Sequence, residues 1–385
     1  MSKEFHLKKA LVLTMFSIYL LTFFLIQNSM LNLITNFSDF ALEFKNFYLL
    51  VSILFIVFFN RYSMNQIVVL VGMFIPLFIT RIVAGASPLL ELLIIVSSLK
   101  CVSLKNIIKT IYVTQVLSFT VILLLFFMSV IPDRIVIRDG VTRTSLGFWH
   151  PNTVGLMLLC IFILSIFSEN KFSRLLFKLI LFNAISVTVY GLTNSRTSFI
   201  LVLSVSILVL VQHFFKENNI IFLNTRWFTP SVLLLLLFLS YFASLLYSKG
   251  NSQLIELNAL VSNRISLGSK FLNEYSLTLF GQKVEYNSLN YLVQEIIGFQ
   301  YRVLDNVYLK YLLNFGLIST CLLVWYLYKI SSVLKSNYLK AWNTYLFIFL
   351  IFGLMEQSAF SYGTNFFLFF GVILLNGKEN EEFIK

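Results

Sequence analysis

Apolar residues occur in this chain in long blocks, and the length of these blocks is the feature that most restricts its fold. The blocks run to about 17–21 residues, the length that a helix needs to cross a hydrocarbon core about 30 Å thick. Inside a bilayer, a helix satisfies its backbone polar groups within its own segment. The charged fraction is 12%, about half of the roughly 25% of soluble domains. The sequence therefore predicts an all-α polytopic membrane protein, and it shows no separable soluble domain.

We expect about twelve transmembrane helices, of which the second and the eleventh are short. They fall near residues 10–27, 47–60, 64–80, 82–99, 110–131, 152–168, 175–194, 197–215, 227–247, 306–329, 342–354 and 359–375. The basic N-terminal segment resembles a signal peptide, but no small-residue cleavage site follows its apolar run, so we expect an uncleaved first span. Residues 1–385 then form a single integral membrane domain. Two long extracytoplasmic loops are predicted, at 132–151 and at 248–305.

The basic residues indicate the orientation, because cytoplasmic loops carry the excess of lysine and arginine. More of them fall on the side of the two termini, which places both termini in the cytoplasm and the long loops outside the cytoplasmic membrane. Most of the basic residues on the inner side are lysine, whereas most on the outer side are arginine. Arginine grips phosphate oxygens with a planar fork. The formal charge of +12 therefore indicates membrane lipids and an anionic lipid-linked substrate as partners, and no nucleic acid.

The segment RTSLGFWHPN, from Arg143 to Asn152, is a polar island between two apolar runs. Pro151 suits the first turn of a helix and pushes His150 into an extended conformation. Asn152 then lies at a helix start, where free backbone N–H groups attract an anion. The alternative is a plain helix-entry loop, with Trp149 at the membrane interface and His150 in solvent.

A second polar segment, Asn194 to Thr197, interrupts a stretch of about 41 residues, enough for two helices joined by a very tight outer turn. Arg196 would lie at or just beneath the membrane surface, where an unpartnered charge is costly and suggests function. The alternative is that Arg196 reaches to phospholipid headgroups.

The long outer loop carries Arg264 in NRISLGSKFL, then LFGQ ending at Gln282, and it closes with Asp305 and Asn306 before a span that contains Tyr308. Recurring apolar residues predict short amphipathic helices in this loop. Asp305 and Asn306 are good helix caps, which is their plain explanation. Asp305 could instead act as a base or bind a sugar hydroxyl. Two further carboxylates, Glu91 and Glu356, could pair with an arginine or accept a proton.

No metal-ligand set, Walker motif or dinucleotide fingerprint occurs, so the sequence predicts no cofactor and no metal. The energy for any reaction would then come with the substrate. The three cysteines, Cys101, Cys160 and Cys321, fall on separate predicted helices, and we interpret them as packing residues.

Taken in order, RTSLGFWHPN, TNSRTSF, SNRISLGSKF with LFG, and LDNVYLKYLLNFGL resemble the Wzy-type polysaccharide polymerases of the O-antigen polymerase/ligase superfamily. The resemblance covers about residues 143–316. It implies a GT-C-like fold and metal-independent polymerisation of undecaprenyl-pyrophosphate-linked oligosaccharide repeat units into capsular, exo- or O-antigen polysaccharide. The expected protein partners are a flippase and a chain-length regulator.

Carried over motif by motif, the resemblance implies that Arg143, Arg196 and Arg264 hold the donor pyrophosphate. Asn152, Asn306 and Tyr308 would join them in binding substrate. Ligases often have a histidine where this chain has Asp305, which favours a polymerase and leaves the base open between Asp305 and His150. The alternatives are a ligase of the same superfamily and, from another class, a flippase or transporter for lipid-linked oligosaccharides.

Overall fold

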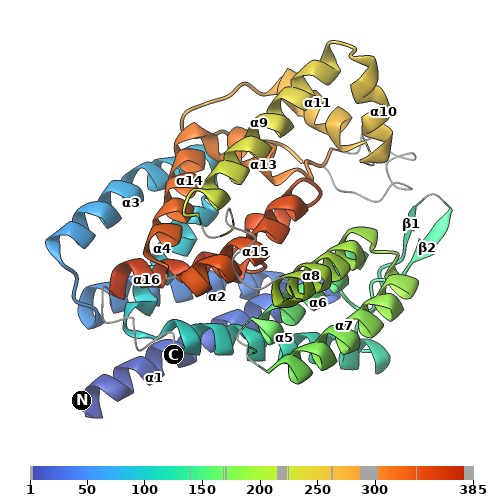
Figure 1. Ribbon diagram of the computed structural model, residues 1–385. Coiled ribbons are helices and arrows are strands. Elements are labelled where there is room, and N and C mark those ends of the chain that lie inside the picture. Colours follow the sequence, from blue (N-terminus) through green and yellow to red (C-terminus); the bar gives the residue numbers. More distant parts are fainter. Residues whose placement is uncertain are drawn as a thin grey trace. The chain divides into compact units, whose positions relative to one another are not determined.

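The computed structural model describes residues 3–138, 140–167, 169, 171–214, 223, 225–261, 263–286, 302–334 and 336–376. This part of the chain is almost entirely helical, with one two-stranded hairpin (Figure 1). Its contacts divide it into two compact units, each described here by itself. The first unit draws on Met1–Tyr62, Ile94–Ile221 and Tyr362–Lys385, and the second on Ser63–Leu93 and Phe222–Ser361.

Eight helices in the described residues are long and apolar enough to cross a membrane, which confirms a helical, membrane-embedded protein. They are Leu7–Gln27, Asn36–Phe59, Met64–Ala84, Leu104–Phe127, Phe172–Thr193, Arg196–Phe214, Phe228–Ser248 and Val307–Val333. The apolar helices Pro151–Ile166, Leu339–Gly353 and Phe366–Asn376 are shorter. Each of the eight long helices overlaps one of the twelve spans expected from the sequence.

Three of the expected spans differ in the structure. The second is long, because its helix already begins at Thr35. The span expected at 82–99 is broken after Ala84, where Gly85 takes a left-handed conformation (φ 77°), and its helix starts only at Pro88. The span expected at 359–375 consists of separate 3-10 turns, Gln357–Phe360 and Phe366–Gly371, followed by a short helix. Apolarity alone did not distinguish the last two segments, which the protein buries, from continuous spanning helices.

The first unit contains most of the N-terminal half of the chain and the C-terminal segment. Its helices are α1 (Lys3–Thr22), α2 (Thr35–Leu54), α5 (Leu104–Phe127), α6 (Pro151–Ile166), α7 (Phe172–Thr193), α8 (Arg196–Phe214) and α16 (Val372–Asn376). The helix α4 (Pro88–Ser98) contains the boundary between the two units. Two strands that the sequence did not predict, β1 (Val136–Arg138) and β2 (Val141–Arg143), pair antiparallel with Val136 opposite Arg143.

The helix α6 is the centre of the first unit, and it packs beside α7 and α8 (Figure 1). Nearly all of its residues are buried, as expected for a helix that is apolar on every side. Gly155 allows α6 and α8 to approach closely, because a methyl group there would lie 2.6 Å from Cβ of Ser198. Aromatic contacts fasten the N- and C-terminal parts of this unit: Tyr19 stacks on Tyr48, and its hydroxyl bonds with that of Tyr362.

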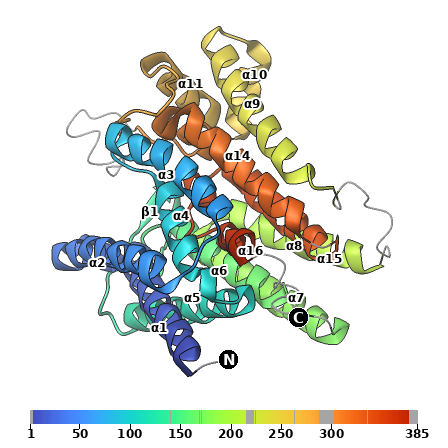
Figure 2. The same cartoon turned by 90° about the vertical axis from the view of Figure 1, so that its left-hand side faces the viewer.

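The second unit is built on long helices that lie side by side. Its elements are α3 (Met64–Ala84), α9 (Phe228–Ser248), α10 (Ser252–Leu260), α11 (Arg264–Glu274), α13 (Val307–Lys310), α14 (Gly316–Val333) and α15 (Ser336–Gly353). Figure 2 shows α14 running between α3 and α9, and it contacts both. The helices α10 and α11 confirm the prediction of short helices in the long loop; residues 287–301 of that loop lie outside the described part.

The helix α3 has a well-formed N-terminal cap and a proline that removes one of its backbone hydrogen bonds. Ser63 forms a capping box with Gln66, each side chain accepting a hydrogen bond from the other residue's backbone N–H. Pro76 lies inside the helix, and because proline has no N–H, the carbonyl of Gly72 loses its usual helical donor. The helix nevertheless continues to Ala84, and Thr80 bonds with Ser319 of α14.

Two glycines hold the second unit together at the start of α14. Gly281 and Gly316 both have positive φ, 82° and 80°. A methyl group on Gly281 would lie 2.0 Å from the carbonyl oxygen of Asn314, and one on Gly316 would lie 2.2 Å from the nitrogen of Gly281. The strand-like segment before Gly281 accepts hydrogen bonds from Leu317 and Ile318, which are otherwise unsatisfied donors of the first turn of α14. The LFG and NFG motifs thus pack against each other.

We expect Gly281→Ala to destabilise the protein far more than Gly250→Ala. Both glycines have positive φ, so both substitutions carry about 1–2 kcal/mol of backbone strain. Only Gly281 also faces backbone atoms, whereas nothing lies within 4 Å of a Cβ at Gly250. Gly281→Ala should therefore exceed about 4 kcal/mol. Thermal unfolding of the purified protein in detergent measures both effects, and equal losses of Tm would contradict the close backbone approach.

Candidate functional site

The RTSLGFWHPN loop is a rigid, well-bonded structure. Gly147 has φ 80° and no space for a side chain, since a methyl group would lie 2.8 Å from Phe126 and from Ile131. Its carbonyl accepts a hydrogen bond from Met30, and Trp149 N–H donates to the carbonyl of Asn28. Two backbone bonds therefore fasten the loop to the turn that follows α1.

Arg143 is buried and its guanidinium is engaged by the protein. Its Nε donates to the carbonyl of Thr193 at 2.8 Å, and its terminal nitrogen donates to Oδ1 of Asn152 at 2.7 Å. Thr193 is the last residue of α7, and Asn152 lies in the first turn of α6. Arg143 therefore joins the hairpin to two helix ends, which is a positioning role rather than an open binding site.

His150 and Pro151 have the conformations that the sequence predicts. His150 is extended (φ −152°, ψ 149°), and Pro151 is the first residue of α6. The Nδ1 atom of His150 accepts a hydrogen bond from the backbone N–H of Asn152, so the imidazole caps the helix. A ring nitrogen that accepts this bond does not carry the proton. His150 can thus serve as a base only through Nε2.

Arg196 lies at the predicted tight turn. The helix α7 ends at Thr193, and α8 begins at Arg196 after only two residues. Asn194 makes the reversal in a left-handed conformation, with φ 47°. The Arg196 side chain is exposed, and its one described hydrogen bond goes to Asn194 Oδ1 at 3.4 Å. In the first unit, it is the predicted site residue that is most open to a ligand.

In the second unit, Arg264 is the first residue of α11 and is largely buried. Its Nε donates to the carbonyl of Met355 at 3.0 Å, and its NH1 donates to the carbonyl of Val261 at 3.4 Å. The remaining terminal nitrogen lies 3.8 Å from a carboxylate oxygen of Asp305. This last contact is an ion pair that is longer than a hydrogen bond.

Asp305 and Asn306 have different roles, although the sequence offered helix capping for both. Asn306 is the cap of α13: its Oδ1 accepts from the N–H groups of Tyr308 and Leu309, and its amide donates to Ser240 of α9. Asp305 does not cap the helix. Its carboxylate is one-quarter exposed and lies 3.8 Å from the guanidinium of Arg264.

Tyr308 is a packing residue in this structure. Its ring is 1% exposed, and its hydroxyl donates to the carbonyl of Leu350 in α15. Gly353 makes room for this contact, because a methyl group there would lie 2.7 Å from Val307. Tyr308 therefore holds α13 against α15.

Lys310 lies close to Asp305, and the sequence motifs did not mark it as a site residue. Its ammonium donates to Oε1 of Gln357 at 2.5 Å and interacts electrostatically with Asp305. It also lies 5.8 Å from the ring centre of Tyr286, within the range of a cation–π contact. A lysine inside an otherwise apolar span was the available signal, since such charges mark functional sites by default.

Tyr286 completes this side of the cluster. Its hydroxyl bonds with Asn314, two residues before Gly316. Burial of that hydroxyl raises the pKa of Tyr286, so it remains a neutral donor. The glycine contact between the LFG and NFG motifs and the charged cluster are thereby linked through one tyrosine.

Outside the motif residues, several arginines and carboxylates have partners of their own. Glu91 accepts from Arg81 at 3.3 Å, which confirms its expected pairing with an arginine. Arg302 pairs with Glu274, and Arg134 lies over the ring of Trp149. Glu356 directly precedes the 3-10 turn that carries Gln357.

The structure thus forms two groups from the predicted residues. In the first unit, Arg143 contacts Asn152 directly and holds the turn that presents Arg196. In the second unit, the cationic groups of Arg264 and Lys310 both interact electrostatically with Asp305, the residue before Asn306. The second group therefore combines two cationic side chains with a partly exposed carboxylate. In the described residues, no group of three or more histidine, cysteine, aspartate or glutamate side chains could hold a metal ion.

No protein-family model, curated protein or solved structure matches this chain.

We expect Arg143→Met to destabilise the protein by about 1.5–3 kcal/mol, the cost of removing a charged donor from buried acceptors. Arg196→Met should stay within about 0.5 kcal/mol, because its side chain is exposed. Thermal unfolding of both variants, each purified in the same detergent, distinguishes the two arginines. A large loss of Tm for Arg196→Met would contradict its assignment as an open side chain.

Proposed function

We propose that the protein is a metal-independent membrane glycosyltransferase of the Wzy type. It would polymerise undecaprenyl-pyrophosphate-linked oligosaccharide repeat units into capsular, exo- or O-antigen polysaccharide at the outer face of the cytoplasmic membrane. The observation that carries this proposal is the cluster of Arg264, Asp305 and Lys310 at the start of α13. A partly exposed carboxylate that interacts with two cations, at the end of a membrane helix, suits a reaction between a sugar hydroxyl and a lipid pyrophosphate.

The reaction requires an acceptor for one proton and stabilisation of one growing negative charge. The hydroxyl oxygen of the acceptor sugar forms a bond to the anomeric carbon of the donor, which inverts that carbon. The bond from this carbon to the pyrophosphate oxygen breaks, and its electron pair leaves with the pyrophosphate. The hydroxyl proton passes to the carboxylate of Asp305, which acts as the general base. The growing chain is thereby transferred to a new lipid-linked unit and extended at its reducing end.

The cations supply the electrostatic part of catalysis. Charge on the departing pyrophosphate increases in the transition state, and fixed cations near it lower the barrier without reorganisation. Arg264 is held in place by the carbonyls of Met355 and Val261, so its position does not depend on substrate. Arg196 is exposed at its turn in the first unit, and the motif resemblance is the reason to propose it as a further phosphate ligand. Arg143 and Asn152 act by holding that turn and the start of α6.

His150 is the second candidate for the base. Its Nδ1 is occupied as a helix cap, so only Nε2 could take the proton. Asp305 instead has a carboxylate that is one-quarter exposed and lies beside the cation of Arg264. We therefore assign Asp305 as the base and His150 as the residue that shapes the start of α6.

The full GT-C-like arrangement is part of the proposal. Twelve crossings require the shorter apolar helices Pro151–Ile166, Leu339–Gly353 and Phe366–Asn376 to cross with the eight long ones. The region of Pro88–Ser98 would form the remaining crossing. An even number of crossings places both termini in the cytoplasm, with the arginine-rich loops outside.

The proposed substrates also define the partners. The donor is already activated by its lipid pyrophosphate, so the reaction requires neither a nucleotide nor a metal. A flippase must deliver lipid-linked repeats to the outer face, and a chain-length regulator would set when the transfer stops. Membrane lipids surround the apolar helices, and no nucleic acid takes part.

The proposal predicts that Arg196→Ala, Arg264→Ala and Asp305→Asn each lower polymer formation by about one to two orders of magnitude. This range follows from losing about 1.5–3 kcal/mol of transition-state stabilisation. The measurement is the glycan profile of cells in which the variant is the only copy, with its expression level determined. Arg302→Ala is the matched control, since Arg302 pairs with the exposed Glu274 in the same outer loop.

The glycan profile also distinguishes the alternatives. A loss of long polymer, with single lipid-linked repeats still reaching the outer face, supports the polymerase. Full-length polymer that stays on its lipid carrier would identify a ligase instead. Repeats that accumulate only at the cytoplasmic face would identify a flippase and would contradict the site.

A further inference from the structure

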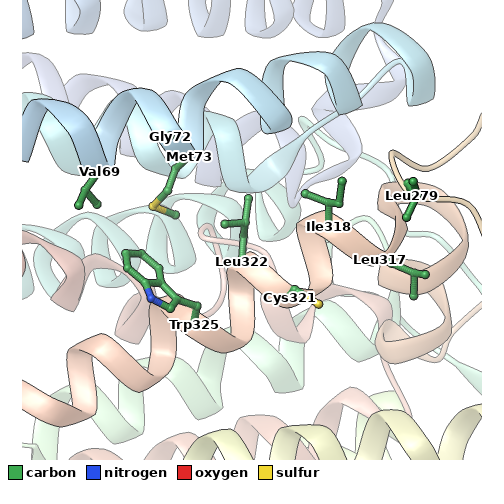
Figure 3. A pocket seen from close by; sticks show the side chains of 9 residues that line it. All are labelled: Val69, Gly72, Met73, Leu279, Leu317, Ile318, Cys321, Leu322 and Trp325. Carbon is green, nitrogen blue, oxygen red and sulfur yellow. The ribbon is translucent and has the colours of Figure 1, made fainter.

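An apolar groove of about 570 Å³ lies between α3 and α14. Its lining residues are Val69, Gly72, Met73, Leu279, Leu317, Ile318, Cys321, Leu322 and Trp325. Figure 3 shows Val69 and Met73 of α3 facing Leu322 and Trp325 of α14, with Leu279 at the far end. None of these side chains is charged, so the groove can accept hydrocarbon but offers nothing to hold a polar ligand along its length.

The two walls belong to helices that are each long enough to cross a membrane. The open side of such a groove therefore faces lipid, and an aqueous filling would leave its apolar lining exposed to water. The lining of α14 extends from Leu317 to Trp325, which is about 12 Å of helix. That length matches most of one leaflet, about half of a core roughly 30 Å thick.

The end of the groove at Leu279 is closed by the segment that packs on the start of α14. Leu279 accepts the hydrogen bond of Ile318, and the chain then turns at Gly281. Four residues after Leu279, the side chain of Lys283 passes beside the end of α3: its Cε lies 3.6 Å from the position of a Cβ at Gly85. The closed end therefore brings a cation to the C-terminal end of α3.

Two basic side chains are available at that end. Lys283 is exposed and makes no ion pair or hydrogen bond with the described residues. Arg81, in the last turn of α3, pairs with Glu91 through one nitrogen, and its side chain is 39% exposed. Glu91 pairs with Arg81, and Lys283 adds a second, exposed cation at this end.

We propose that this groove binds one acyl chain of an anionic glycerophospholipid, whose headgroup lies on Lys283 and Arg81. The groove length suits a single acyl chain in one leaflet, whereas a long isoprenoid carrier would extend far beyond Trp325. Basic residues at the membrane surface attract anionic lipids. The site is separate from the Asp305 cluster, so this inference stands independently of the proposed glycosyl transfer. A lipid bound there stabilises the folded protein by mass action.

A pair of glycine variants tests the groove itself. Gly72 lines it and Gly191 lies on α7 in the first unit; both are helical and exposed, and neither has any atom within 4 Å of a Cβ position. Gly72→Leu therefore starts from a Cβ position without close neighbours and places an apolar side chain at the groove, and Gly191→Leu adds the same side chain elsewhere. Leucine favours a helix more than glycine does, so both variants should fold.

A pair of lysine variants tests the headgroup. Lys283→Gln removes the exposed cation at the end of the groove. Lys270→Gln removes an equal charge from the exposed face of α11. Both variants have the same net charge, so a difference between them reports position rather than overall electrostatics.

The experiment is native mass spectrometry of the purified full-length protein titrated with phosphatidylglycerol or with phosphatidylcholine. We expect one tightly retained phosphatidylglycerol on the parent protein and on Gly191→Leu. Gly72→Leu should weaken that binding at least about tenfold, since the new side chain displaces several methylenes of the acyl chain. Lys283→Gln should weaken phosphatidylglycerol about fivefold with little change for phosphatidylcholine, and Lys270→Gln should have no such effect.

Equal lipid retention by Gly72→Leu and the parent protein would overturn the proposal. It would also be overturned if added polyprenyl phosphate displaced the bound phosphatidylglycerol from the parent protein and Gly72→Leu abolished that binding. In that case the groove holds the tail of the substrate. Polymer formation by Gly72→Leu cells is a separate readout: retained polymer with lost phospholipid supports the lipid site regardless of whether the glycosyl-transfer proposal holds.

Discussion

The second unit depends on a backbone crossing that only glycine permits. Gly281 and Gly316 approach so closely that a methyl group on either would overlap main-chain atoms of the other segment. The crossing lets the segment before Gly281 satisfy the first donors of α14, and it directs the following residues across the end of α3. The position of Tyr286 beside Lys310, and of Lys283 beside Gly85, both follow from it. The LFG and NFG motifs therefore have a structural role, and through it they position Lys283 and Tyr286.

The arginines show that one residue type can serve two purposes in the same protein. Arg143 has its guanidinium between a helix end and a side-chain amide, where a buried fork satisfies several acceptors at once. Arg196 projects from the turn that Arg143 supports. Arg264 is intermediate: two bonds fix it to carbonyls, and its third contact is a loose ion pair with Asp305. Sequence motifs alone gave these three residues the same expected role.

The backbone conformations at helix ends could be predicted from the sequence, but the contacts between distant segments could not. The extended conformation of His150, the first-turn Pro151 and the tight reversal before Arg196 follow from short-range rules, and the structure has them. The span expected at 359–375 was wrong as a continuous helix, because Phe366 to Phe370 are buried by the protein itself. An apolar run covered by protein has the same composition as one covered by lipid. The partners of Lys310 were equally hidden, since Tyr286 and Gln357 are distant in sequence.

Pro76 has a mechanical consequence for the helix that carries it. With no donor for the carbonyl of Gly72, bending α3 at that level breaks no hydrogen bond, and Gly72 has no side chain to resist the movement. The opposite helix is continuous from Gly316 to Val333. The groove between them therefore has one wall that can bend, α3, and one wall that is stiff, α14. Its width changes when α3 bends.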